Sequence, residues 1–376
     1  MVFSEKSKVI MNTLGFNKDP SETTVVVAMS GGVDSSVTAG LLKKEGYNVI
    51  GITLQLYSSN NSAKKGSCCS GIDIYDARRV AQKLDIPHYV FNYEKTFKED
   101  VIDYFIQSYE NGETPIPCVK CNETVKFRDL LGFAKKLDAD CMATGHYIKR
   151  KGKTENALMY RAEDKSKDQS YFLFSMTQDQ LDYLRFPLGD IPKEQTRKIA
   201  EEIGLVVYNK KDSQDICFIP DGDYKKFLKS QKKKGEIIDL HGNFLSYHEG
   251  IQNFTVGQRR GIGVSSNEPL YVIDILKEKN QIIVGDKKDL LGTSLLLDNL
   301  NFIMPEYDFS KPELQISCSA KIRSLSEPMK GKLIKKSQIY SFEFDEPAEA
   351  ITKGQACVLY DQDRVLGGGI ISQKLN

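Results

Sequence analysis

The sequence predicts an α/β protein whose first part is a doubly wound parallel sheet, followed by a small central domain and a C-terminal β-barrel. Two observations support this prediction. From Thr23 to Thr144, β-branched apolar runs alternate with helix-like segments, a pattern typical of parallel sheets that bind ligands at the carboxyl ends of their strands. After about residue 205 the alternation stops, and from Leu270 short alternating runs separated by turns indicate a small barrel or sandwich.

The length of 376 residues exceeds that of a single hydrophobic core, so several domains are expected. We expect a loosely ordered extension at 1–20, the sheet domain at 21–215, the central domain at 216–290 and the barrel at 291–376. The N-terminus lacks a signal-peptide pattern, and no stretch of about 18 apolar residues is present. The sequence therefore predicts a cytoplasmic protein without a membrane partner.

Each element of the sheet domain follows from its own residues. The first strand is a β-branched run that ends at a glycine turn, and the first helix ends at Gly46, which suits a left-handed C-terminal position. Pro87 closes a later helix. The expected strands are 23–29, 48–56, 88–91 and 141–144, and the expected helices are 35–45, 72–84, 95–109 and 125–137.

The net charge of +1 predicts no polyanionic partner by itself. A nucleic-acid surface would need locally concentrated cations, such as the six lysines of Lys225–Lys234, although such a run is equally typical of a solvated helix face. Eight cysteines in an intracellular chain of this length do not suggest a disulfide scaffold. A single pair, Cys118 and Cys121, is a weak zinc signal without a second pair.

The segment Ser30–Ser36, SGGVDSS, lies between the first strand and the first helix. Two adjacent glycines let the backbone approach an anion closely, and the free N–H groups at the helix start can hold phosphate. No Gly-Lys-Ser/Thr follows, so the segment is not a Walker A loop. S-G-G-x-D-S is the pyrophosphate loop of ATP pyrophosphatases, although a turn needed only for packing remains an alternative.

Three further segments contain residues with reactive or polar side chains. Cys118 and Cys121 precede an expected helix start near Thr124, Lys167–Tyr171 reads KDQSY, and Cys217 lies in Lys211–Pro220. Cys141, Cys318 and Cys357 lie in apolar or β-rich surroundings and are expected to be packing residues.

Together these segments resemble the tRNA-specific 2-thiouridylases, a family of the pyrophosphate-loop superfamily, from about Val25 to the C-terminus. The matching blocks are AMSGGVDSS, the pair Cys121-Asn122, ATGHY, KDQSYFL, KDSxxICFI, GQRRGIG, KGQACVLYD and LGGGII. The resemblance implies an adenylation domain and a tRNA-uridine 2-sulfurtransferase. Such an enzyme uses ATP to replace the C2 oxygen of the wobble uridine with sulfur, through an adenylated uridine and a cysteine persulfide.

The resemblance also implies roles for individual residues. Cys217 would carry the persulfide received from a donor or carrier protein, and Cys121 would act as partner nucleophile and close a disulfide with Cys217. Apart from the resemblance, Asp34 is a candidate ligand for a Mg²⁺ ion on the leaving pyrophosphate, because this hard cation prefers oxygen ligands. ATP would bind at Ala28, Met29, Ser30, Gly31, Gly32, Val33, Asp34, Ser35, Leu54 and Gly145. The tRNA would contact Cys118, His146, Lys167, Asp168, Gln169, Arg323, Ser324 and Gln355.

One residue departs from the family pattern, which more commonly has an aspartate at the position of Cys118. Cys118, Cys121 and Cys217 would suit a [4Fe–4S] cluster with an open iron, which is the alternative to a persulfide relay. Two other classes share parts of the pattern. An amide-forming ATP pyrophosphatase would not need the separated cysteines, and an RNA-binding module would not release pyrophosphate.

Overall fold

The computed structural model describes residues 11–57, 71–152, 154–212, 216–219, 224–228, 233–304 and 306–375. The chain forms two compact units. The first contains Met1–Phe97, Thr124–Ser170 and Met176–Phe218, and the second contains Lys98–Glu123, Tyr171–Ser175 and Ile219–Asn376. Each unit has its own hydrophobic core in the described part of the chain.

The first unit is built on a five-stranded parallel sheet in the order β3-β2-β1-β4-β7. Its strands are β1 (Thr24–Ala28), β2 (Asn48–Gln55), β3 (His88–Asn92), β4 (Cys141–Thr144) and β7 (Leu184–Arg185). Strand order reverses between β1 and β4, so the loops after these two strands flank the crevice where such sheets bind ligands. The expected doubly wound sheet is confirmed.

The α-helices in the described part of this unit are α1 (Val33–Lys44), α2 (Gly71–Leu84), α3 (Glu94–Phe97), α6 (Leu131–Lys136), α7 (Gln178–Tyr183) and α8 (Lys193–Glu202). A hairpin of β5 (Ile148–Lys151) and β6 (Leu158–Arg161), which the sequence did not indicate, follows β4. The expected strands and the first two helices are confirmed to within about two residues. The left-handed φ of +90° at Gly46 confirms how α1 ends.

The expectation that residues 11–20 are loosely ordered is wrong. Leu14 is only 9% exposed, and its carbonyl accepts a 2.8 Å hydrogen bond from Arg185 Nε. The Thr13 hydroxyl lies 2.7 Å from Tyr47 Oη, and Asn12 Nδ2 donates to Thr23 Oγ1. Tertiary hydrogen bonds therefore fix a segment whose own sequence has no periodic pattern; residues 1–10 lie outside the described residues.

The expected start of the helix near Thr124 is also wrong. Helical structure begins at Pro117, with α5 (Pro117–Cys121), a π-helical stretch (Asn122–Leu130) and then α6. Proline suits the first helical position because its φ is already helical and it has no N–H to satisfy. The helix expected at 95–109 likewise consists of α3 (Glu94–Phe97), a π-helical stretch (Lys98–Ile102) and α4 (Asp103–Glu110).

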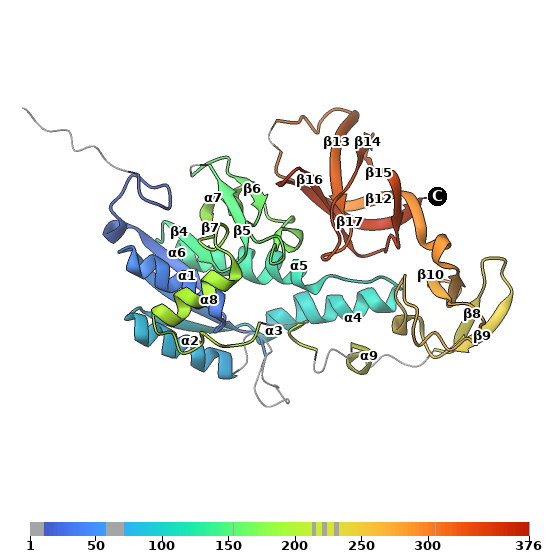
Figure 1. Cartoon of the computed structure of the whole chain (residues 1–376), viewed down its shortest axis with the longest axis horizontal. Coiled ribbons are helices and arrows are strands. Elements are labelled where there is room, and N and C mark those ends of the chain that lie inside the picture. The colour runs from blue at the N-terminus through green and yellow to red at the C-terminus, as the bar shows by residue number, and fades with distance from the viewer. Residues whose placement is uncertain are drawn as a thin grey trace, which may run out of the picture. The chain divides into compact units, whose positions relative to one another are not determined.

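The second unit contains two β structures (Figure 1). A four-stranded sheet, β10-β11-β8-β9, is formed by β8 (Gly235–Ile238), β9 (Phe244–His248), β10 (Tyr271–Leu276) and β11 (Gln281–Gly285). A six-stranded barrel follows in the order β12-β15-β14-β13-β16-β17 and is closed by pairing of β12 with β17. Its strands are Leu291–Phe302, Glu313–Lys321, Met329–Lys336, Ile339–Glu349, Ala356–Asp361 and Arg364–Leu375, for β12 to β17 in turn.

The expected C-terminal barrel is confirmed, but the alternating runs at 271–275 and 281–285 belong to the preceding sheet. A short helix, α9 (Tyr224–Phe227), precedes that sheet, and part of the run Lys225–Lys234 lies outside the described residues. In the described ranges, no helix is both long and apolar enough to cross a bilayer.

Candidate functional site

The pyrophosphate loop lies between β1 and α1, where the sheet order reverses. Gly31 has a left-handed φ of +73°, and a Cβ there would lie 2.1 Å from the Asp73 carbonyl oxygen. Gly32 is the N-cap residue of α1 in extended conformation. The Ser30 N–H donates to Ser35 Oγ at 3.1 Å, which ties the two ends of the loop together. The loop therefore presents the N-terminus of a twelve-residue helix with a backbone only glycine can adopt.

Gly145, after β4, approaches the same loop closely. A Cβ at Gly145 would lie 2.7 Å from Ser35 N and 3.0 Å from Asp34 Cβ. The structure thus brings Gly145 together with Ala28–Ser35, as the resemblance implied. Leu54 is buried near the carboxyl end of β2, and Thr53 beside it donates to the Met29 carbonyl at 2.6 Å. These residues line the carboxyl edge of one sheet.

We predict that Gly31→Ala abolishes ATP-dependent pyrophosphate release, because the added methyl group would overlap the Asp73 backbone and force the loop or α2 to shift. The matched control is Gly132→Ala in α6, where a Cβ meets nothing within 4 Å. The control should keep its activity and be more stable by about 0.5–1 kcal/mol. Wild-type pyrophosphate release by Gly31→Ala would show that the loop conformation is not required.

Asp34, in the first turn of α1, is fully engaged by other side chains. Its Oδ1 accepts from Lys193 Nζ at 2.6 Å and from Tyr147 Oη at 2.8 Å, and its Oδ2 lies 2.8 Å from Lys193 Nζ. The Lys193 side chain is only 10% exposed. Both carboxylate oxygens therefore already hold a buried ammonium group, and they do not fit the expected role of a ready Mg²⁺ ligand.

Lys193 belongs to a larger network of charges. Its ammonium also lies 3.0 Å from Asp212 Oδ1, which accepts from Arg197 Nη2 at 2.6 Å. Lys167 Nζ donates to Asp212 Oδ2 at 3.0 Å. Burial acts to raise the pKa of Asp212, but hydrogen bonds from Lys193 and Lys167 outweigh it and lower that pKa. Asp212 therefore stays ionised near neutral pH, and its carboxylate holds three cations beside the loop.

Tyr147 completes this network as a neutral donor. Burial, and then the charge of Asp34, raise the pKa of Tyr147 well above its ordinary value. Its hydroxyl therefore stays protonated and donates to Asp34. Sequence reasoning missed Lys193 and Arg197, because no motif spacing connects them to the loop, whereas Tyr147 and Asp212 were within quoted segments without an assigned role.

The expected tRNA contacts of the first unit have different environments. Lys167 is half-buried in its ion pair with Asp212, whereas the Asp168 side chain is 1% exposed and accepts from Ser170 Oγ at 2.7 Å. Gln169 Oε1 accepts from the Tyr147 N–H at 2.8 Å. Asp168 and Gln169 therefore fix the turn that presents Lys167.

His146 lies beside this turn, and its Nδ1 is 2.8 Å from Thr144 Oγ1. Burial, together with the charge of Lys126, lowers the pKa of His146 well below its ordinary value. His146 is therefore neutral at physiological pH and can hydrogen-bond to a substrate without attracting phosphate charge.

Cys121 and Cys217 belong to different compact units. Cys118 is exposed in the first turn of the helix that starts at Pro117, whereas Cys121 is 8% exposed and one turn further on. Because the helix dipole acts mainly within the first turn, it favours the thiolate of Cys118 more than that of Cys121. In the first unit, half-buried Cys217 accepts from Tyr57 Oη through its carbonyl oxygen at 3.3 Å.

Asn122, next to Cys121, has an unusual side chain. It is 3% exposed, and its Nδ2 donates to the Phe172 carbonyl at 3.0 Å. Its Oδ1 is buried and has no hydrogen-bond partner among the described residues. A buried acceptor of this kind is costly to leave unpaired.

The segment that leads to Cys118 is anchored to the barrel of the second unit. Gln355 Nε2 donates to the Thr114 carbonyl at 2.9 Å, and the Thr114 N–H donates to the Lys353 carbonyl at 2.9 Å. Lys353 Nζ also pairs with Glu113 at 3.2 Å. Gln355, which is expected to contact tRNA, therefore holds the segment that leads to Cys118.

The other two expected contacts of the barrel, Arg323 and Ser324, lie in the loop between β13 and β14. Arg323 Nη2 donates to the Ala350 carbonyl at 3.0 Å, and the following Leu325 is 97% exposed. The loop therefore has a solvent-exposed residue at Leu325, whereas Arg323 and Ser324 are half-buried.

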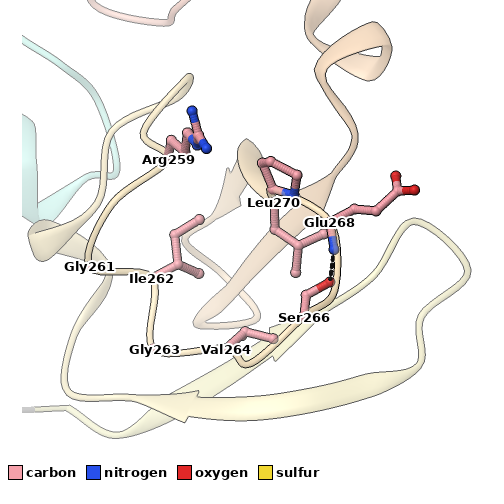
Figure 2. Close-up of a pocket in the computed structure, with 9 residues that line it drawn as sticks. Arg259, Gly261, Ile262, Gly263, Val264, Ser266, Glu268 and Leu270 are labelled. Carbon is pink, nitrogen blue, oxygen red and sulfur yellow. Dashed lines mark hydrogen bonds between the residues drawn. The ribbon is translucent and has the colours of Figure 1, made fainter.

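A cavity of about 240 Å³ lies in the second unit (Figure 2). It is formed largely by the GQRRGIG segment and the residues after it. Its lining is Arg259, Gly261, Ile262, Gly263, Val264, Ser266, Glu268, Pro269 and Leu270.

Three further cysteines are packing residues, as expected. Burial raises the pKa of the Cys141 thiol to about 12 and that of Cys318 to about 11, and it raises the pKa of Cys357 further still. Such thiols carry almost no thiolate near neutral pH and are poor nucleophiles. Cys68 and Cys69 lie outside the described residues.

Comparison with known proteins gives matches along nearly the whole chain. A tRNA methyl transferase HUP domain model matches residues 23–221, its PRC-barrel domain model matches 225–286, and an aminomethyltransferase beta-barrel domain model matches 292–371. A protein of Hyphomonas neptunium named tRNA-specific 2-thiouridylase MnmA is 49% identical, over 97% of this chain and 95% of that one.

Proteins with the same name from Bartonella tribocorum and Roseobacter denitrificans are each 50% identical. The first match covers 97% of this chain and 92% of the relative, and the second covers 96% and 97%. A solved complex of a 4-thiouridine synthetase with RNA and bound ATP is 18% identical, with a TM-score of 0.34 over 52% of this chain and 45% of that one. That likeness is too distant to bear on function.

Proposed function

This chain belongs to the family of tRNA-specific 2-thiouridylases, and from this membership we propose that it uses ATP to exchange the C2 oxygen of the tRNA wobble uridine for sulfur. The observation that carries the proposal is identity of about half the residues over nearly the full length of both chains. The domain models describe methyl transfer, but they match single domains, whereas the 2-thiouridylases match the complete chain.

The proposed reaction begins at the pyrophosphate loop. The uridine C2 oxygen attacks the α-phosphorus of ATP, pyrophosphate leaves, and an O-adenylated uridine results. The loop N–H groups and the ammonium of Lys193 supply positive charge where the leaving group gains negative charge. Asp34 and Asp212 hold Lys193 in place, so their role is to orient that cation.

Sulfur transfer follows at the cysteines. The terminal sulfur of a persulfide on Cys217 attacks C2 and displaces AMP. The thiolate of Cys121 then attacks the Cys217 sulfur, forming a disulfide and releasing 2-thiouridine. An external reductant restores the two thiols for the next cycle. Buried Asn122, with an unpaired acceptor beside Cys121, is suited to hold the N3–H of the target base.

The sulfur donor in this proposal is an unidentified persulfide or carrier protein, and the reaction takes place in the cytoplasm. Mg²⁺ would arrive with ATP as part of the substrate, since Asp34 is already paired with Lys193. In the described part of the chain, no three His, Cys, Asp or Glu side chains are arranged to hold a metal ion.

Incubating the purified protein with unmodified tRNA, MgATP and a persulfide source tests the proposal. We expect the wobble nucleoside to gain mass corresponding to exchange of oxygen for sulfur, in an amount that depends on ATP. An amide-forming enzyme would release pyrophosphate only with a small acid, and an RNA-binding module would release none. Either result would replace the proposed function.

We predict that Ser324→Glu weakens tRNA binding about tenfold at low salt, because it adds a negative charge next to Arg323 in the loop between β13 and β14. Gln338→Glu is the matched control, since it adds the same charge at an exposed turn between β14 and β15. Filter binding at two salt concentrations measures both. Equal affinities of the two variants would show that this loop does not meet tRNA.

Deletion of the whole barrel is a poorer test. The barrel holds residues 113 and 114 through Lys353 and Gln355, so its removal would also disturb the segment that leads to Cys118.

A further inference from the structure

A second ion-pair centre lies on the other side of the pyrophosphate loop. Lys210 Nζ donates to the Gly31 carbonyl at 2.9 Å, to Asp73 Oδ1 at 2.7 Å and to Asp76 Oδ2 at 2.7 Å. Its side chain is 24% exposed, and that of Asp73 is 6% exposed. One ammonium group thus joins the loop backbone to the first turns of α2.

Lys210 and Asp212 are two positions apart and hold the loop in two ways. Lys210 contacts the loop backbone at Gly31, whereas Asp212 acts through Lys193 on Asp34 in the first turn of α1. We call residues 210–212 the strap. A displacement of the loop by nucleotide phosphates must therefore either carry the strap along or break the Lys210–Gly31 hydrogen bond and partly buried ion pairs.

The strap is also fixed from α8. Arg197 Nη1 donates to the carbonyl oxygens of Tyr208 at 3.1 Å and Lys210 at 2.8 Å, while Nη2 of the same guanidinium holds Asp212. One guanidinium group therefore holds both the backbone and the Asp212 side chain of the strap. A few residues further along the same chain lies Cys217, and all of these residues belong to the first compact unit.

We propose that Lys210 and Asp212 are positioning residues that couple occupation of the ATP site to the reactivity of Cys217. This inference rests on the proposed function, because it takes the loop as the ATP site and Cys217 as the sulfur carrier. Phosphates bound by the loop N–H groups fix the loop, the two ion-pair centres pass that restraint to the strap, and the strap limits the freedom of the segment bearing Cys217. The sulfur-bearing cysteine is then held still while the uridine is being adenylated.

The test is the rate at which iodoacetamide alkylates Cys217, measured by mass spectrometry of its peptide with and without a saturating non-hydrolysable ATP analogue and Mg²⁺. In the wild-type protein the analogue should slow alkylation about fivefold or more, the lower end of common coupling between sites. In Lys210→Met and in Asp212→Asn the slowing should fall below about twofold at saturating analogue. The matched control is Lys211→Met, an exposed lysine of the same strap, which should keep the wild-type ratio.

Calorimetric titration of the analogue on the same samples separates the possible failures. If the analogue binds the wild-type protein without slowing alkylation, or if both variants keep the wild-type slowing, the coupling does not exist. If the analogue does not bind the wild-type protein at all, the proposed function is wrong. The coupling proposal, which rests on it, is then also wrong. Thermal unfolding checks that each variant is folded, and two independent variants keep the result informative if one is not.

Discussion

Replacing Cys217 with serine is expected to abolish thiolation, by at least about 10³-fold, while ATP-dependent release of pyrophosphate continues. A hydroxyl group cannot carry a persulfide sulfur, whereas attack on the α-phosphorus requires no thiol. Cys121→Ser should have the same effect on turnover, because the disulfide that releases the product cannot form. Thiolated nucleoside and pyrophosphate are measured in the same reaction.

Cys318→Ser is the matched control, because burial keeps that thiol protonated and it lies in barrel strand β13. It should retain thiolation. Loss of pyrophosphate release in Cys217→Ser, or thiolation in either Cys121→Ser or Cys217→Ser, would contradict the relay.

Cys118 distinguishes the relay from cluster chemistry. Its place in the first helical turn, with an exposed side chain, suits a supporting role, so Cys118→Ser should only reduce thiolation under the relay. If the three cysteines instead hold an iron–sulfur cluster, Cys118→Ser should be as damaging as the other two substitutions. Anaerobically purified protein would then also be coloured and lose activity in air.

Replacing Asp34 with alanine is expected to reduce ATP-dependent pyrophosphate release about 10²-fold or more and leave tRNA affinity nearly unchanged. The substitution removes the carboxylate that holds the Lys193 ammonium and the Tyr147 hydroxyl beside the loop. Lys193 would keep only Asp212, so its charge would lie away from the leaving group. Asp34→Asn, which can still accept from Tyr147, should be less damaging.

The matched control is Asp179→Ala, an exposed aspartate in the first turn of another helix, α7. It removes the same charge from an equivalent helical position and should have wild-type pyrophosphate release. A wild-type rate in Asp34→Ala would mean that the loop is not the site of adenylation.

The sequence by itself determined the features that depend on near neighbours. The β-branched run at Thr24–Ala28 gave a strand because such residues pack well in a sheet buried on both faces. The turn at Gly31 was readable because only glycine adopts its left-handed backbone without strain. The helix start at Pro117 was equally local and was missed, although a proline at the first helical position is a known signal.

Only the tertiary structure decided what surrounds the loop. Asp34 and Lys193 are 159 positions apart, and Lys210 is 137 positions from Asp73, so no spacing in the sequence connects them. Likewise, Gln355 lies 241 positions from the Thr114 carbonyl that its side chain holds. Local propensities act over a few residues, whereas these ion pairs and hydrogen bonds form only after the sheet and the barrel have folded. The sequence could therefore place the phosphate loop. The lysines that contact it, Lys193 and Lys210, could be identified only from the tertiary structure.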